Sequence, residues 1–276
     1  MTMSSKHSGS VILSLSKDPE WRAEGAHIAG RERAIMKRSD FCCISTASMI
    51  AAAAQPLQAS AADSTLPATI AGVKIPDSYA AKQATTQAQD VEAPHIFRHS
   101  ARSFVFAELV SQARGVKHDP EIVYIAAMLH DIGLSKEFAT PHVRFEIDGA
   151  DRTKQVLTAA GHSPTDAQIG WDAVVLHSIF SIARFKEPEV FLLSAGVLTD
   201  VGGAFLPNLD KAQIAQVLAA LPRKGFNAAF LAALTDYARR KSDTVGGTFV
   251  EDIAVHTIPG YKRGDFYEAL LQPDQF

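Results

Sequence analysis

The sequence predicts an all-α fold that follows a non-globular N-terminal tail. From about residue 76 onward, apolar residues recur at the three- and four-residue spacing of a helix, and strand-like alternation is hard to find. Residues that commonly begin helices recur through the same stretch. The chain has 276 residues, of which 47% are hydrophobic, which is enough apolar material for a folded core. We therefore assign residues 76–276 to one helical domain.

The N-terminal tail divides into three parts. Residues 1–35 mix charged residues, glycine and serine without a hydrophobic period, and we interpret them as an unstructured upstream extension. Residues 36–61 begin with Met36 and two basic residues, continue with an apolar stretch, and end in Ala59-Ser60-Ala61, a pattern typical of a secretory signal peptide. Residues 62–75 are expected to be a flexible lead-in to the helical domain.

The signal-peptide interpretation places the start of translation at Met36 and the mature protein in the periplasm or outside the cell. The alternative is that the same alanine-rich residues form a buried helix of the fold. Cleavage after Ala61 would leave a mature chain without cysteine, which suits an oxidising compartment.

Helix starts can be read along the body of the chain. Asp119-Pro120 combines an N-cap residue with proline at the first helical position, and Gly133 is expected to mark the end of that helix. Ser163 begins another helix, with Asp166 at the spacing of a capping box. Further helices are expected to begin at Pro188, at Asn208, and at Thr248 with Glu251.

Two apolar stripes at helical spacing follow residue 210. They consist of Ile214, Val217, Leu218 and Leu221, and then of Phe226, Phe230, Leu234 and Tyr237. Such stripes pack equally well in the chain's own core or between two copies of the chain, so the sequence leaves a homodimer open.

The composition excludes several classes of function. A formal net charge of -3 gives no basic excess for binding a phosphate backbone, so nucleic acid is not expected as a partner. No run reaches the roughly 18–20 apolar residues of a membrane-spanning helix, so no stable membrane insertion is expected. The two cysteines, Cys42 and Cys43, are adjacent and cannot form a disulfide framework or a cysteine-rich zinc site.

Four residues of metal-ligand type occur together on apolar helices. His99, His130 and Asp200 each share a helical face with apolar neighbours, and Asp131 follows His130 directly. A buried aspartate is costly unless it is paired or coordinates a metal. Nitrogen and oxygen donors in this mixture suit zinc, iron or manganese. We therefore predict that all four bind one divalent ion, although a single inward histidine would more often be an ordinary core residue.

A fifth polar residue, His177, shares a helical face with apolar residues, namely Ile169, Ala173 and Val174. It is a candidate for a proton shuttle or for an additional ligand. A supporting role without direct ligation also remains open.

The order of His99, the His130-Asp131 pair and Asp200 resembles the HD-domain superfamily of metal-dependent hydrolases and lyases. Within this superfamily the chain is most similar to the branch that contains the cyanamide hydratases of fungi and yeast and their bacterial relatives. The similar segments are IPDSYAAKQATTQAQD from Ile75, HSARSFVFAELV from His99, PEIVYIAAMLHDIGL from Pro120, RFEIDGAD from Arg144, WDAVVLHS from Trp171 and VFLLSAGVLTDVGG from Val190.

The resemblance implies an HD-type helical bundle with a metal site between helices. In HD families with two metals, a further histidine usually opens the helix after the His-Asp pair. Phe145 stands at that place in this chain, and His142 lies three residues earlier in a loop. The departure implies one metal ion, for which zinc is expected from the cyanamide hydratase branch, with iron and manganese as alternatives.

Three functions follow as hypotheses. The first is a hydrolase or hydratase that uses a metal-activated water on a small molecule, including nitrile or cyanamide hydration. In this hypothesis Asp131 and His177 are catalytic, whereas Arg144 and Glu146 line the substrate pocket. The second is a phosphohydrolase acting on a nucleotide or phosphate ester, although few basic residues lie near the His-Asp pair. The third is a non-catalytic metal-binding helical module.

Overall fold

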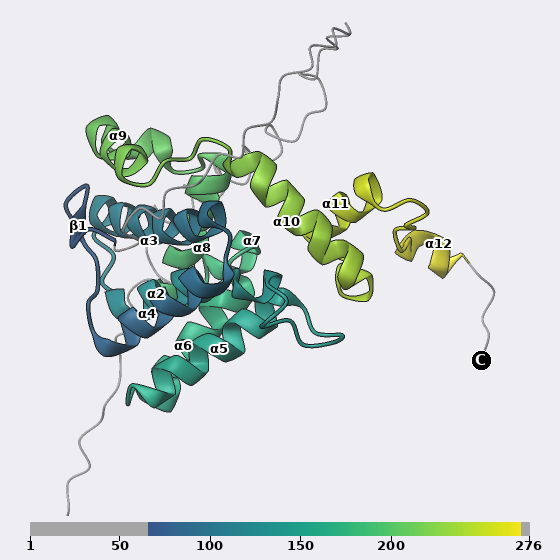
Figure 1. Cartoon of the computed structure of the whole chain (residues 1–276), viewed down its shortest axis with the longest axis horizontal. Coiled ribbons are helices and arrows are strands. Elements are labelled where there is room, and N and C mark those ends of the chain that lie inside the picture. The colour runs from purple at the N-terminus through teal and green to yellow at the C-terminus, as the bar shows by residue number, and fades with distance from the viewer. Residues whose placement is uncertain (1–65, 272–276) are drawn as a thin grey trace, which may run out of the picture. The chain divides into compact units, whose positions relative to one another are not determined.

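A computed structural model describes residues 66–271, which form helices and one small β-hairpin (Figure 1). The predicted all-α class is therefore confirmed. The predicted extension at residues 1–35 and the predicted signal peptide at residues 36–61 lie outside the described residues.

The elements of the first half lead from the hairpin to the helices around the centre of the fold. They are β1 (Thr69–Ile70), β2 (Val73–Lys74), α2 (Tyr79–Val91), α3 (Pro94–Arg114), α4 (Pro120–Leu129), the 3₁₀ helix η2 (Ile132–Leu134), α5 (Phe145–Ala159) and α6 (Pro164–Leu176).

The second half continues with helices of varied length. They are α7 (Phe180–Ala183), α8 (Pro188–Gly202), η3 (Leu206–Asn208), α9 (Lys211–Ala220), α10 (Phe226–Arg240), η4 (Ser242–Thr244), α11 (Phe249–Thr257) and α12 (Phe266–Leu270).

The hairpin lies within the predicted flexible lead-in, so the structure differs from that expectation. Strands β1 and β2 pair antiparallel, with Ile70 opposite Val73, and both of these side chains are buried. Ala71 and Gly72 join the strands with φ angles of 52° and 82°, which matches a type I′ turn. Each strand is only two residues long, so the sequence contains no alternation of apolar and polar residues long enough to predict the hairpin.

Most predicted helix starts are confirmed by hydrogen bonds from backbone N–H groups to the capping side chains. The Asp119 carboxylate accepts from Glu121 at 2.8 Å, Ser163 Oγ accepts from Asp166 at 3.1 Å, and Thr248 Oγ1 accepts from Val250 at 3.1 Å. The start predicted at Asn208 is wrong, because that residue ends η3. Asp210 caps α9 instead, accepting from Ala212 and Gln213.

The helix that begins at Pro120 ends earlier than predicted. Helix α4 stops at Leu129, and Gly133 lies inside η2. Gly133 is needed there for close packing, since a Cβ atom at this position would lie 2.4 Å from the carbonyl oxygen of Phe145. The glycine therefore marks an approach between η2 and α5 rather than a helix end.

Helix α4 lies at the centre of the fold and packs against α2, α3, α5, α6 and α8. Every residue from Ile122 to Leu129 is buried, as expected for a helix that is apolar on all sides. The most extensive pairing between helices is that of α3 with α8. Among the described residues, no helix is both long enough and apolar enough to cross a membrane.

The α3–α8 pairing predicts the effect of Gly196→Ala. A Cβ atom at Gly196 would lie 2.1 Å from the carbonyl oxygen of Ser103, so one backbone must move. We expect a loss of about 3 kcal/mol in the free energy of unfolding, measured by urea denaturation. Gly202→Ala is the matched control, because nothing lies within 4 Å of the added atom at the end of the same helix. Equal stability of the two variants would contradict the prediction.

Candidate metal centre

The centre is built around His99, which is fully buried on α3. Its Nδ1 donates a hydrogen bond of 2.7 Å to Oδ2 of Asp200 on α8. A carboxylate only accepts hydrogen bonds, so the proton of the neutral imidazole is on Nδ1 and the lone pair is on Nε2. The tight α3–α8 pairing thus fixes both the orientation and the tautomer of His99.

His130 and His177 acquire the same tautomer from the ends of their helices. Each follows the last residue of a helix, α4 or α6, as its C-cap. Each donates from Nδ1 to the carbonyl oxygen three residues earlier, Ala127 or Val174, at 2.7 Å. The last carbonyl groups of a helix have no partner within the helix, so they are available as acceptors. Both imidazoles are left with an unprotonated Nε2.

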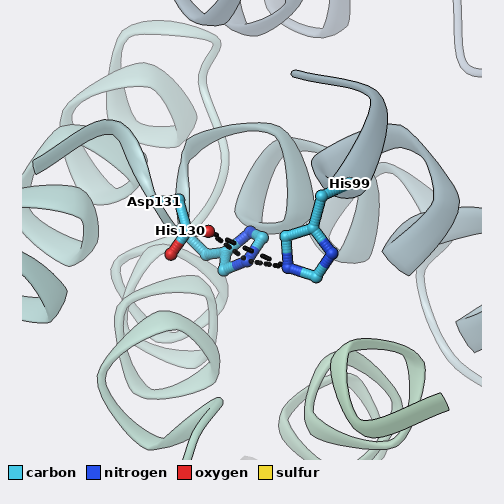
Figure 2. A group of neighbouring side chains, drawn as sticks. All are labelled: His99, His130 and Asp131. Carbon is cyan, nitrogen blue, oxygen red and sulfur yellow. Dashed lines mark hydrogen bonds and ion pairs between the residues drawn. The ribbon is translucent and has the colours of Figure 1, made fainter. Parts of the chain in front are cut away.

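Three electron-pair donors converge between α3 and the end of α4 (Figure 2). Nε2 of His99 lies 3.3 Å from Nε2 of His130. Oδ2 of Asp131 lies 3.4 Å from Nε2 of His130 and 3.8 Å from Nε2 of His99. No proton separates the two nitrogens, and Oδ2 of Asp131 is buried without a hydrogen-bond partner.

This arrangement fits a divalent metal ion. Two ligands at ~2.1 Å from a tetrahedral ion lie about 3.4 Å apart, close to the donor spacings of the cluster. Two imidazole nitrogens and one carboxylate oxygen also form a typical protein ligand set for zinc. Without a cation, by contrast, three lone pairs would face one another in a buried site, which is unfavourable.

Asp200 is not a member of this cluster, contrary to the prediction from the sequence. Both of its oxygens are already occupied, because Arg102 donates to Oδ1 at 2.6 Å and to Oδ2 at 2.9 Å, and His99 also donates to Oδ2. Asp200 therefore orients the ligand histidine, as carboxylates beside metal-binding histidines commonly do. The sequence indicated that Asp200 lies near His99, but it could not show which side chains contact the two carboxylate oxygens of Asp200.

Burial controls the charge of the cluster residues. Burial, followed by the neighbouring imidazole, lowers the pKa of His130 to about 3 and that of His177 to about 4. Burial also raises the pKa of Asp131. It would raise the pKa of Asp200 as well, but hydrogen bonds from His99 and Arg102 lower that value to about 2. His130 and His177 are therefore neutral near pH 7, the state in which imidazole binds a metal.

The remaining predicted site residues are His177 and the pair Arg144 and Glu146, which lies on the same side of the centre as His177. The ring of His177 meets the ring of His130 edge-on, with centroids 4.9 Å apart. Glu146 is buried and pairs with Arg144, and its charge acts on His177 to raise its pKa. Arg144 and Glu146 thus border the centre through His177, and neither belongs to the three-residue cluster.

The prediction of one metal ion rests on Phe145 and His142, which lie in different surroundings. Phe145 is buried with its ring edge-on to His177, at a centroid distance of 5.9 Å. His142 has a side chain that is 85% exposed and pairs with Asp243 in the loop. The residue that could replace the missing histidine therefore points to solvent.

Sequence reasoning missed two parts of the site. Arg102, fully buried under Asp200, lies one helical turn after His99, but arginine is rarely expected in a core. Phe226 and Phe230 were predicted only as part of an apolar stripe, in the core or between two copies, yet both rings pack on His99, with centroids 5.0 and 5.6 Å away. Their helical stripe was visible in the sequence, but nothing in it indicated which element it would cover.

Two substitutions separate a ligand from a residue that orients it. Asp131→Asn should abolish metal binding while leaving the metal-free protein as stable or more stable, because it removes a buried charge whose Oδ2 has no partner. Asp200→Asn should lower the free energy of unfolding by about 2–4 kcal/mol, because Arg102 loses its carboxylate partner. Elemental analysis and urea denaturation measure both effects. Similar stability losses in the two variants would contradict the assignment.

The metal-free protein should lose stability as the pH falls from about 6.5 to 4. In this window unfolded His130 and His177 bind protons that the folded protein excludes, with a slope of up to ~1.4 kcal/mol per pH unit for each group. His177→Gln should therefore flatten the dependence measured by urea denaturation. His118→Gln is the control. Burial lowers the pKa of His118, but the contacts with Glu108, Val116 and Glu189 together outweigh it and raise the pKa, so its contribution changes above about pH 6.5 and leaves the slope in this window nearly unchanged. An unaltered slope in the His177→Gln protein would refute this account.

A comparison with known protein families matches the segment that contains the three-residue cluster. The family model described as the HD domain matches residues 96–199, from α3 into α8. This segment contains His99, His130 and Asp131, and Asp200 is the next residue after it. No curated protein matches the chain, and the narrower likeness to cyanamide hydratases stays a prediction. Residues 96–199 are thus similar to the HD domain, and the three-residue cluster lies within the matched segment.

Proposed function

We propose that the protein is a metal-dependent hydrolase or hydratase that acts on a small molecule. HD domains are in general metal-dependent hydrolases, and a His-His-Asp cluster able to hold an ion lies within the matched segment. The observation that carries the proposal is the convergence of two unprotonated imidazole nitrogens on an unpartnered carboxylate oxygen. Such a cluster is unfavourable without a cation, so its presence in a folded protein favours a cation-binding role.

His99, His130 and Asp131 would hold the ion, and Asp200 with Arg102 would fix the orientation of His99. When bound, a divalent ion supplies a Lewis acid and lowers the pKa of a water molecule. Asp131, whose pKa is raised, is suited to accept a proton from that water. His177 is neutral near pH 7 and has an unprotonated Nε2, so it can pass a proton between the centre and the substrate.

We propose one ion per centre, with zinc as the expected metal and iron or manganese as alternatives. Phe145 occupies the place where a second-metal histidine was expected, and it offers no ligand atom. The resemblance to cyanamide hydratases makes small nitriles the first substrates to test, with an amide-type product. Arg144 and Glu146 would border the substrate on the His177 side.

Hydrolysis of a nucleotide or phosphate ester is the alternative reaction. The nearest guanidinium groups do not favour it, because Arg102 is paired with Asp200 and Arg144 with Glu146. Export through residues 36–61 remains part of the proposal and would make a cytosolic nucleotide an unsuitable substrate. A purely structural metal is disfavoured by the neutral His177 beside the cluster, which a structural site would not need.

The test is a substrate screen coupled to elemental analysis. Purified protein should contain about one equivalent of divalent metal and should hydrate cyanamide or another small nitrile, with activity lost on chelation. His130→Ala should remove the metal and lower the rate by more than about 100-fold. His142→Ala is the matched control, since this histidine is exposed in a loop.

Full metal content in the His130→Ala protein would refute the ligand assignment. Phosphate release from nucleotides, in the absence of nitrile turnover, would favour the alternative reaction. Metal binding without turnover of either class would indicate a metal-binding module.

A further inference from the structure

Helix α10 lies outside the matched HD segment, yet it contacts the candidate centre directly. It packs on α3, which carries His99, and on η2, which follows Asp131. Its end is fastened by Arg240, which donates to the carbonyl oxygen of Leu134 at 2.7 Å, and by the neighbouring Lys241, which pairs with buried Asp148 at 3.2 Å. The position of α10 over the centre is therefore fixed by the fold.

The start of α10 presents a column of aromatic rings to the metal ligand. The ring of Phe226 stacks on His99 at a centroid distance of 5.0 Å, and Phe230 stacks on Phe226 at 5.1 Å with an interplanar angle of 18°. Phe230 also reaches His99 itself, at 5.6 Å. Phe226 is buried, whereas Phe230 is partly exposed, so Phe230 is the outer member of the column.

Access to the centre must pass residues at its border, because the ligands are closed off from solvent. His99 and His130 are 0% exposed and Asp131 is 2% exposed. A residue on the route has to be partly exposed and also contact a ligand. Phe230 meets both conditions, through its partial exposure and its contact with the His99 ring.

Two guanidinium groups near this border are already engaged. Arg102 is fully buried, binds Asp200 through two hydrogen bonds, and donates to the carbonyl oxygens of Leu221 and Pro222. Arg223 donates to the carbonyl oxygens of Asp200 and Val201. Arg102 would have to give up a buried carboxylate to receive a phosphate, and Arg223 would have to exchange its backbone partners for it.

We propose that Phe230 is a specificity-determining residue that admits small uncharged molecules to the centre and excludes phosphate-bearing ones. The face of an aromatic ring carries partial negative charge and disfavours an anion, and a phosphate loses its hydration beside the ring without gaining a free cation. An uncharged molecule is neither repelled by the ring face nor stripped of the strong hydration that a phosphate carries. This inference rests on the proposed metal-dependent function, and it assigns substrate selection to a helix beyond the HD segment.

The test measures binding of inorganic phosphate to the zinc-loaded protein by calorimetry. Phe230→Arg is expected to tighten phosphate binding at least about tenfold relative to the unsubstituted protein. Leu231→Arg is the matched control, because it adds the same charge at the next residue of α10, whose side chain is 47% exposed. It should change the affinity less than about twofold, as expected for an exposed charge. Phe230→Asn, which removes the ring without adding charge, provides a second variant.

A comparison of two esters with the same leaving group tests selection without any substitution. The zinc-loaded protein should hydrolyse p-nitrophenyl acetate in preference to p-nitrophenyl phosphate. A preference for the phosphate ester, or equal effects of arginine at 230 and 231 on phosphate affinity, would overturn the role of Phe230 while leaving the metal-dependent function intact. Failure of the protein to bind zinc would overturn both proposals.

Discussion

The structure of the centre depends on one electrostatic constraint, the close approach of three lone pairs in a buried site. Nε2 of His99 and Nε2 of His130 are 3.3 Å apart, and Oδ2 of Asp131 completes the group without a hydrogen-bond partner. The surrounding fold holds this unfavourable arrangement in place because each imidazole is fastened by its other nitrogen. Packing of the surrounding helices thus offsets the cost of holding this candidate cation site in a preformed arrangement.

The way in which helices end explains how two of the three imidazoles obtain the required tautomer. His130 and His177 each donate to a carbonyl oxygen in the last turn of α4 or α6, where the regular helical hydrogen bonds end and a carbonyl can accept a side chain. The third imidazole, that of His99, lies within a helix where no such carbonyl is free, and it depends on Asp200 from another helix. Hydrogen bonds from His99 and Arg102 together lower the pKa of Asp200 and keep it ionised. A chain of neighbours therefore extends from the metal ligand into the core, and each member has a defined partner.

The sequence predicted the helical fold and most helix starts, and it indicated that His99, His130 and Asp131 face the core, because helical period, capping residues and inward polar side chains are local signals. It grouped Asp200 with them as a fourth ligand, whereas the structure places Asp200 against His99 and Arg102, since spacing shows that a carboxylate faces the core but not which groups it contacts. Gly133 was read as a helix end because its packing against Phe145 is not local. The aromatic column of α10 was not predicted for the same reason, because Phe226 and His99 are far apart in the sequence.

The close crossing of α3 and α8 has a thermodynamic consequence for the centre. Gly196 meets the carbonyl oxygen of Ser103, and each of these residues is one helical turn before or after a partner in the His99–Asp200 hydrogen bond. The spacing of the two helices is therefore coupled to the orientation of the His99 ring. An ion that binds only when His99 is held in this orientation would also stabilise the helix pair, by RT ln(1 + [ion]/Kd) in free energy, so a change that separates the helices would weaken metal binding.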